Sequence, residues 1–454
     1  MYNTYKRILC FASAFISLGL ITSGNAFAGE IPNRFLIAQL IEGQYSQNLE
    51  AASFFQQGVT LYNRSEFQAA ETAFRKALAY DPSIAMAYYL LGNSLFGQGK
   101  TEQATEQYRF ALRLNPTMAE ARYNLGLTLY RQGNLAGAFT EYQQALSLNP
   151  SMAPARYNLG LLYEGQGRVQ EAIAQYREAV KIKPDYAEAQ YNLGLLLAKQ
   201  DQTEPALTAF RQSINSNPNS APAQYQLGLL LAKQGQLDEA RKPLVKAIKL
   251  DPKLAPAQYQ LGLVFSQLGA YGSASSRFEE LTKLEPNNVE AYRRLGSALT
   301  KDGQYGKAIV ALQTAVKLDP SDALTHYNLG VALQQEKKYP EAMAAYQQAI
   351  TLKPDLSDAV YNMGVTLEQT QQRDQALAFL MQARQMFNQQ GNFQKVNDID
   401  QYVKLLTTQP KIPVLLQPTQ PPAIQIQPPE IQPQPPEIQP QPPQQPDLPI
   451  NNSQ

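Results

Sequence analysis

The pentapeptide YNLGL occupies residues 123–127 and recurs at 157–161 and 191–195, each time after a step of 34 residues. A frame that begins at Ala51 and advances by 34 residues fits ten blocks without an insertion or deletion and ends near Gln390. We number the positions within each block from 1 to 34. A fixed period of this length indicates a stack of structural repeats and overrides the number of domains that chain length alone would suggest.

Three positions of the block are nearly constant. Position 8 is glycine and position 20 is alanine in all ten blocks, and position 32 is proline in nine of them. In the block 119–152, Leu125 and Gly126 lie on one side of a predicted first helix, and Ala138 and Tyr142 on one side of a second. Small residues on these sides allow close packing, and the Asn-Pro or Asp-Pro pairs end the second helix. One hairpin cannot bury both of its faces, so the hairpins are expected to stack.

This pattern resembles the tetratricopeptide repeat, in which an aromatic residue, Leu-Gly, a further aromatic residue, alanine, an aromatic residue, alanine and proline occur at fixed offsets. The resemblance covers about three quarters of the chain. It implies an all-α fold, a right-handed superhelical solenoid of ten 34-residue helix hairpins. The first and last blocks depart most from the pattern, as terminal units of such arrays do.

The chain outside the repeats divides into four further segments. The predicted organisation is a signal peptide at 1–28, a linker or cap at 29–50, ten repeats at 51–390, a capping helix at 391–409 and a disordered Pro/Gln-rich tail at 410–454. The capping helix is predicted because Phe393, Val396, Ile399, Val403 and Leu406 recur at helical spacing. The sequence does not decide whether 29–50 is a cap, a linker or an interaction segment.

The N-terminus has the features of a secretory signal. Lys6 and Arg7 precede an apolar stretch at 8–21, and Ala26-Phe27-Ala28 has the small residues of a cleavage site. We therefore expect an exported protein, with the periplasm favoured over secretion or an uncleaved N-terminal anchor. Cleavage would remove Cys10, the only cysteine, and no other stretch is apolar enough to span a membrane.

The tail is rich in proline and glutamine, and QPPEIQP occurs at 427–433 and again at 434–440. Such composition favours an extended polyproline II conformation. Two uses remain open: a spacer that crosses a wall-like layer, or a PxxP ligand for an SH3-like groove.

Composition narrows the classes of function. The formal net charge is +1, so no strong field attracts nucleic acid. The chain has one histidine, His326, and its sequence contains neither a nucleophile elbow nor a phosphate-binding loop. His326 occupies a packed position of its block. We therefore expect neither enzyme activity nor a cofactor or metal.

The candidate site is the side of the first helices that faces away from the second helices, which lines the concave groove in this fold family. Positions 6 and 9 lie there and position 5 flanks them. These three positions form three rows, which we call the ladder face. The rows contain Tyr123, Tyr157, Tyr191, Tyr225 and Tyr259; Asn124, Asn158, Asn192, Gln226, Gln260, Asn328 and Asn362; and Leu127, Leu161, Leu195, Leu229 and Leu263. Amides offer both donors and acceptors to the backbone of an extended peptide. The amide row resembles the asparagine ladder of O-linked N-acetylglucosamine transferases, which implies an extended protein segment as ligand.

Block eight interrupts the rows with Arg293 and Arg294. They are either a cationic spot for an acidic peptide or a C-terminal carboxylate, or solvated surface residues. The carboxylate clamp of chaperone-binding relatives needs lysine at position 5 and asparagine at position 9, so a chaperone C-terminus is not expected.

The predicted function is that of an exported scaffold that holds an extended segment of another protein and supports the assembly of complexes in the cell envelope. A more specific alternative is suggested by a resemblance to periplasmic repeat proteins of cyanobacteria, some of which assemble photosystem II and supply manganese. The scarcity of histidine and cysteine argues against metal delivery. A third alternative is a structural protein of the envelope or septum, tethered through the tail.

Overall fold

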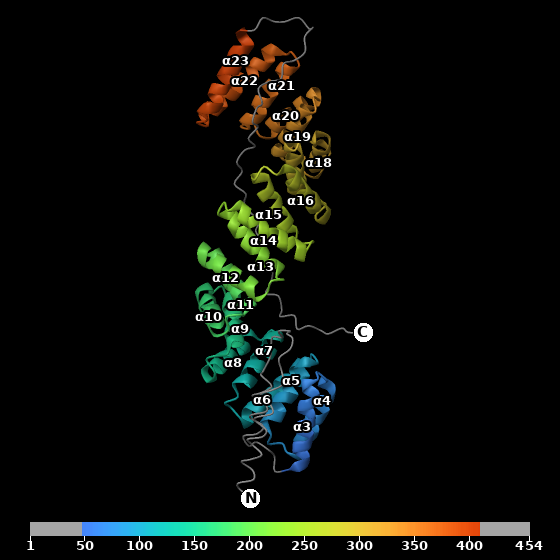
Figure 1. Ribbon diagram of the computed structural model, residues 1–454, viewed down its shortest axis with the longest axis vertical. Coiled ribbons are helices and arrows are strands. Elements are labelled where there is room, and N and C mark those ends of the chain that lie inside the picture. Colours follow the sequence, from blue (N-terminus) through green and yellow to red (C-terminus); the bar gives the residue numbers. More distant parts are fainter. Residues whose placement is uncertain (1–47, 409–454) are drawn as a thin grey trace. The chain divides into compact units, whose positions relative to one another are not determined.

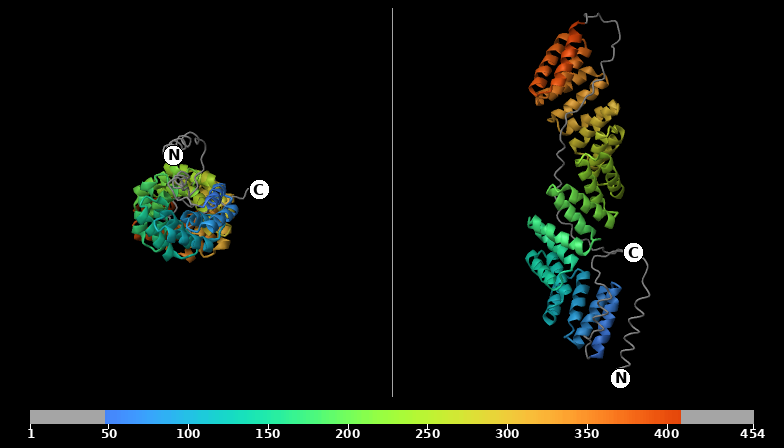
Figure 2. Two further views of the ribbon diagram at one scale, coloured as in Figure 1. Left: turned by 90° about the horizontal axis from the view of Figure 1, so that it is seen from below. Right: turned by 60° about the vertical axis from the view of Figure 1, so that its left-hand side comes forward.

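The computed structural model describes residues 48–408 of the chain (Figure 1). The predicted signal peptide, the segment 29–47 and the Pro/Gln-rich tail lie outside the described residues. The described part forms 21 helices in consecutive pairs and contains no strand. Each pair is an antiparallel hairpin, and we number the hairpins one to ten in chain order (Figures 1 and 2).

The hairpins follow the predicted 34-residue frame. The first helices are α3 (Leu49–Asn63), α5 (Ala85–Gly97), α7 (Ala119–Arg131), α9 (Ala153–Gly165), α11 (Ala187–Lys199), α13 (Ala221–Lys233), α15 (Ala255–Gln267), α17 (Val289–Lys301), α19 (Ala323–Gln335) and α21 (Ser357–Gln369). The second helices are α4 (Phe67–Tyr80), α6 (Thr101–Leu114), α8 (Leu135–Leu148), α10 (Val169–Ile182), α12 (Thr203–Ser216), α14 (Leu237–Leu250), α16 (Tyr271–Leu284), α18 (Tyr305–Leu318), α20 (Tyr339–Leu352) and α22 (Arg373–Gln389). A further helix, α23 (Phe393–Thr408), follows the tenth hairpin.

The described residues belong to two compact units. Hairpins one to three, residues 48–150, form the first unit, and hairpins four to ten with α23, residues 151–408, form the second. Within each unit every second helix also packs against the first helix of the next hairpin. None of the described helices has both the length and the apolar character needed to cross a membrane.

The helix ends follow from local chemistry. Asn149 has the extended conformation, φ −133° and ψ 90°, that the following proline favours, and α8 ends before it. Within hairpins, the turn requires a residue with positive φ. Gly133 supplies it in hairpin three with φ +77°, and Lys337 adopts φ 62° in hairpin nine. Asp322 caps α19, because its carboxylate accepts the backbone N–H of Leu324 at 3.1 Å.

The glycine at position 8 sets the distance between the two helices of a hairpin. In hairpin four, a Cβ added to Gly160 would lie 2.5 Å from the ring of Tyr176, which is fully buried. The same clash, at 2.7 Å, would occur between Gly194 and Phe210 in hairpin five. The side chain at position 24, a ring in seven hairpins and a leucine in hairpins six, eight and ten, therefore packs directly on the backbone of the first helix. Any larger residue at position 8 would push the helices apart.

The last hairpin is covered by α23. Val396 and Ile399 are buried against α22, and Arg384 in α22 forms an ion pair with Asp400, with Nη2 and Oδ2 2.9 Å apart. This helix occupies the place that an eleventh hairpin would take, as expected of a capping helix.

The glycine constraint predicts a large difference between two substitutions in α9. Gly160→Ala should lower the free energy of unfolding of hairpin four by roughly 1–3 kcal/mol, because the added methyl group overpacks against Tyr176. Gly165→Ala is the matched control, since nothing lies within 4 Å of its added Cβ. It should be neutral or stabilising by up to about 1 kcal/mol. Urea unfolding followed by circular dichroism measures both, and equal midpoints for the two variants would contradict the packing role of Gly160.

Candidate functional site

The tyrosine row of the ladder face is partly a packing element. The ring of Tyr157 lies against that of Tyr176 with centroids 5.8 Å apart, and Tyr259 lies 6.2 Å from Phe278 in the same way. Tyr225 is buried, with 7 % of its surface exposed. Position 5 therefore supports the ring that contacts the position 8 glycine, and only part of each tyrosine is available to a ligand.

In several hairpins the amide at position 6 donates a hydrogen bond to the tyrosine at position 5 of the preceding hairpin. Asn192 donates from Nδ2 to the hydroxyl of Tyr157 at 3.2 Å, and Asn362 donates to Tyr327 at 3.3 Å. Asn124 makes the same bond to Tyr89 at 3.2 Å in the first unit. These bonds join residues 35 apart, and we call each of them a clasp. The sequence suggested both a ligand surface and tyrosine packing between repeats, but it did not predict these hydrogen bonds between successive hairpins.

The clasps leave part of the ladder face free for other contacts. A primary amide has two N–H donors and a carbonyl acceptor, and the clasp in hairpin five uses one donor of Asn192. The half-buried members of the predicted site are Tyr123, Asn124, Leu127, Tyr157, Asn158, Leu161, Tyr191, Asn192, Leu195, Gln226, Tyr259, Gln260, Arg293, Arg294 and Asn328. Two predicted residues, Tyr225 and Asn362, are buried. In hairpins four to seven of the second unit, the leucine row at 161, 195, 229 and 263 and the amide row at 158, 192, 226 and 260 are half-buried throughout.

The tyrosine hydroxyls remain protonated donors over the physiological pH range. Burial, followed by the neighbouring Tyr191, raises the pKa of Tyr225 to about 12. Burial also raises the pKa of Tyr191, and a hydrogen bond with Gln226 opposes this effect. The ladder face of hairpins five and six is therefore neutral at these positions, as suits contact with a peptide backbone.

A polar network in the first unit was not predicted. Asn93 stands at position 9 of hairpin two, where the middle hairpins have leucine. Its Oδ1 accepts the hydroxyl of Tyr108 at 2.8 Å and the Nδ2 of Asn124 at 2.8 Å. The sequence signal for this network was asparagine in place of leucine at position 9 of hairpin two. The network turns the ladder residue Asn124 toward the interior of the first unit.

The two arginines of hairpin eight do not form the exposed cationic spot that was one expectation. Both bind the carboxylate of Glu290: Arg293 through Nη2, and Arg294 through Nε at 2.6 Å. The Nε of Arg293 also lies 3.5 Å from Asp322. The side chains of Arg293 and Arg294 are 15 % and 27 % exposed, so they are not solvated surface residues either. The sequence placed Glu290 on the concave side but did not pair it with the arginines, although its spacing of three and four residues from them was the available signal.

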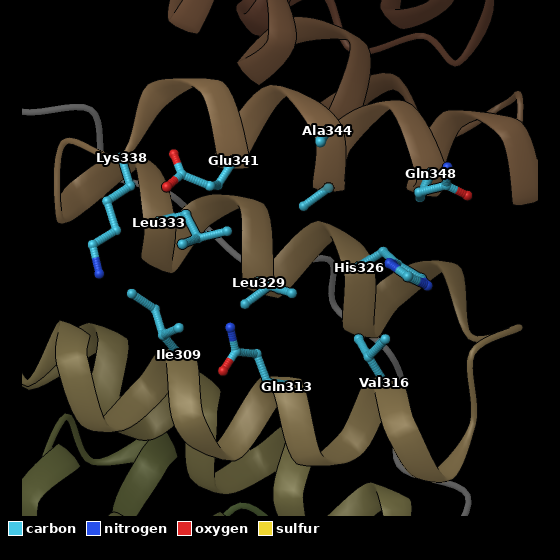
Figure 3. A pocket seen from close by; sticks show the side chains of 11 residues that line it. Ile309, Gln313, Val316, His326, Leu329, Leu333, Lys338, Glu341, Ala344 and Gln348 are labelled. Carbon is cyan, nitrogen blue, oxygen red and sulfur yellow. The ribbon is translucent and has the colours of Figure 1, made fainter.

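A cavity of about 420 Å³ lies between hairpins eight and nine, and its lining comes from α18, α19 and α20 with the residue before α20 (Figure 3). Its lining residues are Ile309, Gln313, Val316, His326, Leu329, Leu333, Lys338, Glu341, Ala344, Ala345 and Gln348. In hairpin three, the residues at two of these positions, Arg122 and Glu141, form an ion pair, with Nη1 and Oε2 3.3 Å apart. Hairpin nine has His326 and Ala345 at these positions and no such bridge. His326 instead places Nε2 2.9 Å from the carbonyl oxygen of Pro320.

The clasp predicts coupling between two hairpins. Asn362→Ala and Tyr327→Phe should each destabilise the second unit, and the double-mutant cycle should give a coupling energy of about 1 kcal/mol. Asn328→Ala is the control, because position 5 of the preceding hairpin is Arg293 and no clasp forms. Its effect should be below about 0.5 kcal/mol. Chemical denaturation measures all four proteins, and zero coupling would show that the hydrogen bond does not hold the hairpins together.

Comparison with known protein families gives a consistent result along the chain. Several models described as tetratricopeptide repeat or TPR repeat match residues 55–104, 89–153, 153–178, 166–201, 188–220, 209–242, 228–269, 255–288, 296–337 and 323–356. Together these matches cover more than half of the chain. A search of curated proteins found no match.

Three solved structures are similar to parts of the chain. YrrB, described as a TPR protein with an unusual peptide-binding site, is 27 % identical over 41 % of this chain and 96 % of its own, with a TM-score of 0.39. PilF of Pseudomonas aeruginosa is 25 % identical over 46 % of this chain and 96 % of its own, with a TM-score of 0.41. MamA from Desulfovibrio magneticus RS-1 is 25 % identical over 37 % of this chain and 96 % of its own, with a TM-score of 0.36.

The period of 34 residues, the ten helix hairpins with glycine packed against the side chain at position 24, and the matches along the chain lead to one conclusion. The chain belongs to the tetratricopeptide repeat family.

Proposed function

We propose that this chain is a scaffold for protein–protein interaction and that it binds an extended segment of a partner protein on the ladder face of hairpins four to seven. One observation carries the proposal. The side chains of Leu161, Leu195, Leu229 and Leu263 stay half-buried on successive first helices, although the rows beside them are largely used in clasps and ring packing. Partly exposed apolar side chains at a regular interval are suited to a ligand that is itself repetitive in structure.

An extended polypeptide is a ligand of this kind, because its own structure repeats along its length. Its side chains alternate between two sides, so that apolar residues on one side meet the leucine row. Its backbone N–H and C=O groups lose water on binding and need new partners. The amide groups of Asn192, Gln226 and Gln260 stand beside the leucines and supply an acceptor as well as a donor.

The ladder face can be tested by selecting linear peptides from a random library on the immobilised chain. The variant Leu161→Gln, Leu195→Gln, Leu229→Gln should lose at least about tenfold in enrichment, since three apolar contacts become polar. The matched control is Leu148→Gln, Leu318→Gln, Leu352→Gln, which changes exposed leucines on second helices. Circular dichroism verifies that both variants fold. Equal enrichment by the ladder variant and the control would reject the ladder face as the binding surface.

We further propose that the scaffold acts outside the cytoplasm, in the periplasm. The support is the charged, apolar and small-residue pattern of residues 1–28. Expression of the full chain in a Gram-negative host, followed by fractionation and mass spectrometry, should find a mature N-terminus at Gly29 in the periplasmic fraction. The outcome that contradicts export is a chain that keeps Met1 and stays with cytoplasmic markers.

A further inference from the structure

We infer that hairpin eight anchors an acidic group of the bound segment, and that Glu290 is an internal counterion that this group displaces. The inference rests on the proposed function, because it assumes a segment lying along the ladder face. It adds the chemistry of the partner: one carboxylate at the end of an otherwise neutral, apolar stretch.

All three rows of the ladder face change character at hairpin eight. Arg293 replaces tyrosine, Arg294 replaces the amide, and Ser297 replaces leucine. The three side chains are half-buried, like their counterparts in hairpins four to seven except Tyr225, which is buried. A ligand that follows the leucine row from hairpin four would therefore meet polar and cationic groups after hairpin seven.

The arginines are held in place by carboxylates on two sides. The carboxylate of Glu290 forms ion pairs with both guanidinium groups. It also accepts a hydrogen bond from the hydroxyl of Tyr259 at 3.4 Å. Asp322 contacts only Arg293, at 3.5 Å, and its oxygens are occupied by the backbone N–H of Leu324 and by the neighbouring threonine hydroxyl. The position of Asp322 is thus fixed by the cap of α19, whereas Glu290 is bound through its side chain alone.

Glu290 is the most accessible member of the cluster. Its side chain is 33 % exposed, compared with 15 % for Arg293 and 27 % for Arg294. A carboxylate from a ligand takes over the bonds of Glu290 when that side chain turns outward to solvent, so the two arginines keep an anionic partner. A neutral group gives no such exchange, because displacement of Glu290 would then leave Arg294 without its carboxylate partner.

The geometry also favours a carboxylate over other acceptors. Guanidinium groups present paired N–H donors that match the two oxygens of a carboxylate, and such charge-assisted bonds are about twice as strong as neutral ones. Arg294 occupies the amide row itself, so a ligand in register with Gln260 in the preceding hairpin would reach it directly. We assign to Arg294 the direct contact and to Arg293 a supporting role.

The experiment uses the same random peptide library on three full-length proteins. The wild type should enrich peptides with an acidic residue at one fixed distance from the apolar positions. Arg293→Tyr, Arg294→Asn, which restores the tyrosine and amide rows, should remove the acidic preference and keep the apolar one. The control Lys233→Gln, Lys301→Gln removes two exposed cations from the same first-helix series and should keep the acidic preference.

Affinity for one synthetic peptide from the wild-type selection gives the decisive comparison. Fluorescence anisotropy should show roughly tenfold weaker binding to the Arg293→Tyr, Arg294→Asn variant, the loss expected for one charge-assisted bond. Glu290→Gln should bind the acidic peptide several-fold more tightly, because the competing charge is gone. A form of the peptide with its acid replaced by the amide should bind wild type and Glu290→Gln equally.

The outcomes separate the inference from the proposed function. If peptides are enriched and depend on the leucine row but show no acidic preference, the inference is wrong and the proposed function stands. Unchanged or weaker binding of the acidic peptide to Glu290→Gln would also overturn the role of Glu290. If no peptide is enriched, or enrichment ignores the leucine row, the proposed function itself fails.

Discussion

The contact between the glycine at position 8 and the side chain at position 24, a ring in seven hairpins and a leucine in the other three, is the constraint on which the rest of the structure depends. In hairpin four the ring of Tyr176 lies so close to Gly160 that no side chain fits between them. This contact sets the spacing of the two helices in each hairpin. The regular spacing in turn places positions 5, 6 and 9 of the first helices in straight rows, and without it neither the clasps nor the leucine row would repeat.

The clasp explains why binding and stability are difficult to separate in this protein. Asn192 both bonds to Tyr157 of the preceding hairpin and faces the proposed ligand, so an alanine substitution there would change two properties at once. The leucine row is the better place to test function, because its half-buried side chains make no hydrogen bonds. Hairpin eight replaces the neutral clasp with the charged cluster around Glu290, and this is the point where the second unit departs most from a uniform ladder.

Much of the fold could be predicted from the sequence because a 34-residue period exposes the packing constraints directly. The hairpins and their turns follow from glycine, alanine and proline at fixed positions, and the capping helix after residue 390 follows from apolar residues at helical spacing. The candidate site was predicted less completely. The pairing of Tyr157 with Asn192, and of Arg294 with Glu290, depends on which side chains reach each other between hairpins or across a helical turn. Position numbers alone place such residues on a face but do not say which of their groups are already bonded.

The central claim is that a partner segment lies along the leucine row of the second unit. Leucine methyl NMR with a peptide from the library selection tests it most directly. The account predicts that resonances of Leu161, Leu195 and Leu229 shift on titration while those of Leu318 and Leu352, on second helices, stay unchanged. Shifts confined to the second-helix leucines, with the leucine row unaffected, would contradict it.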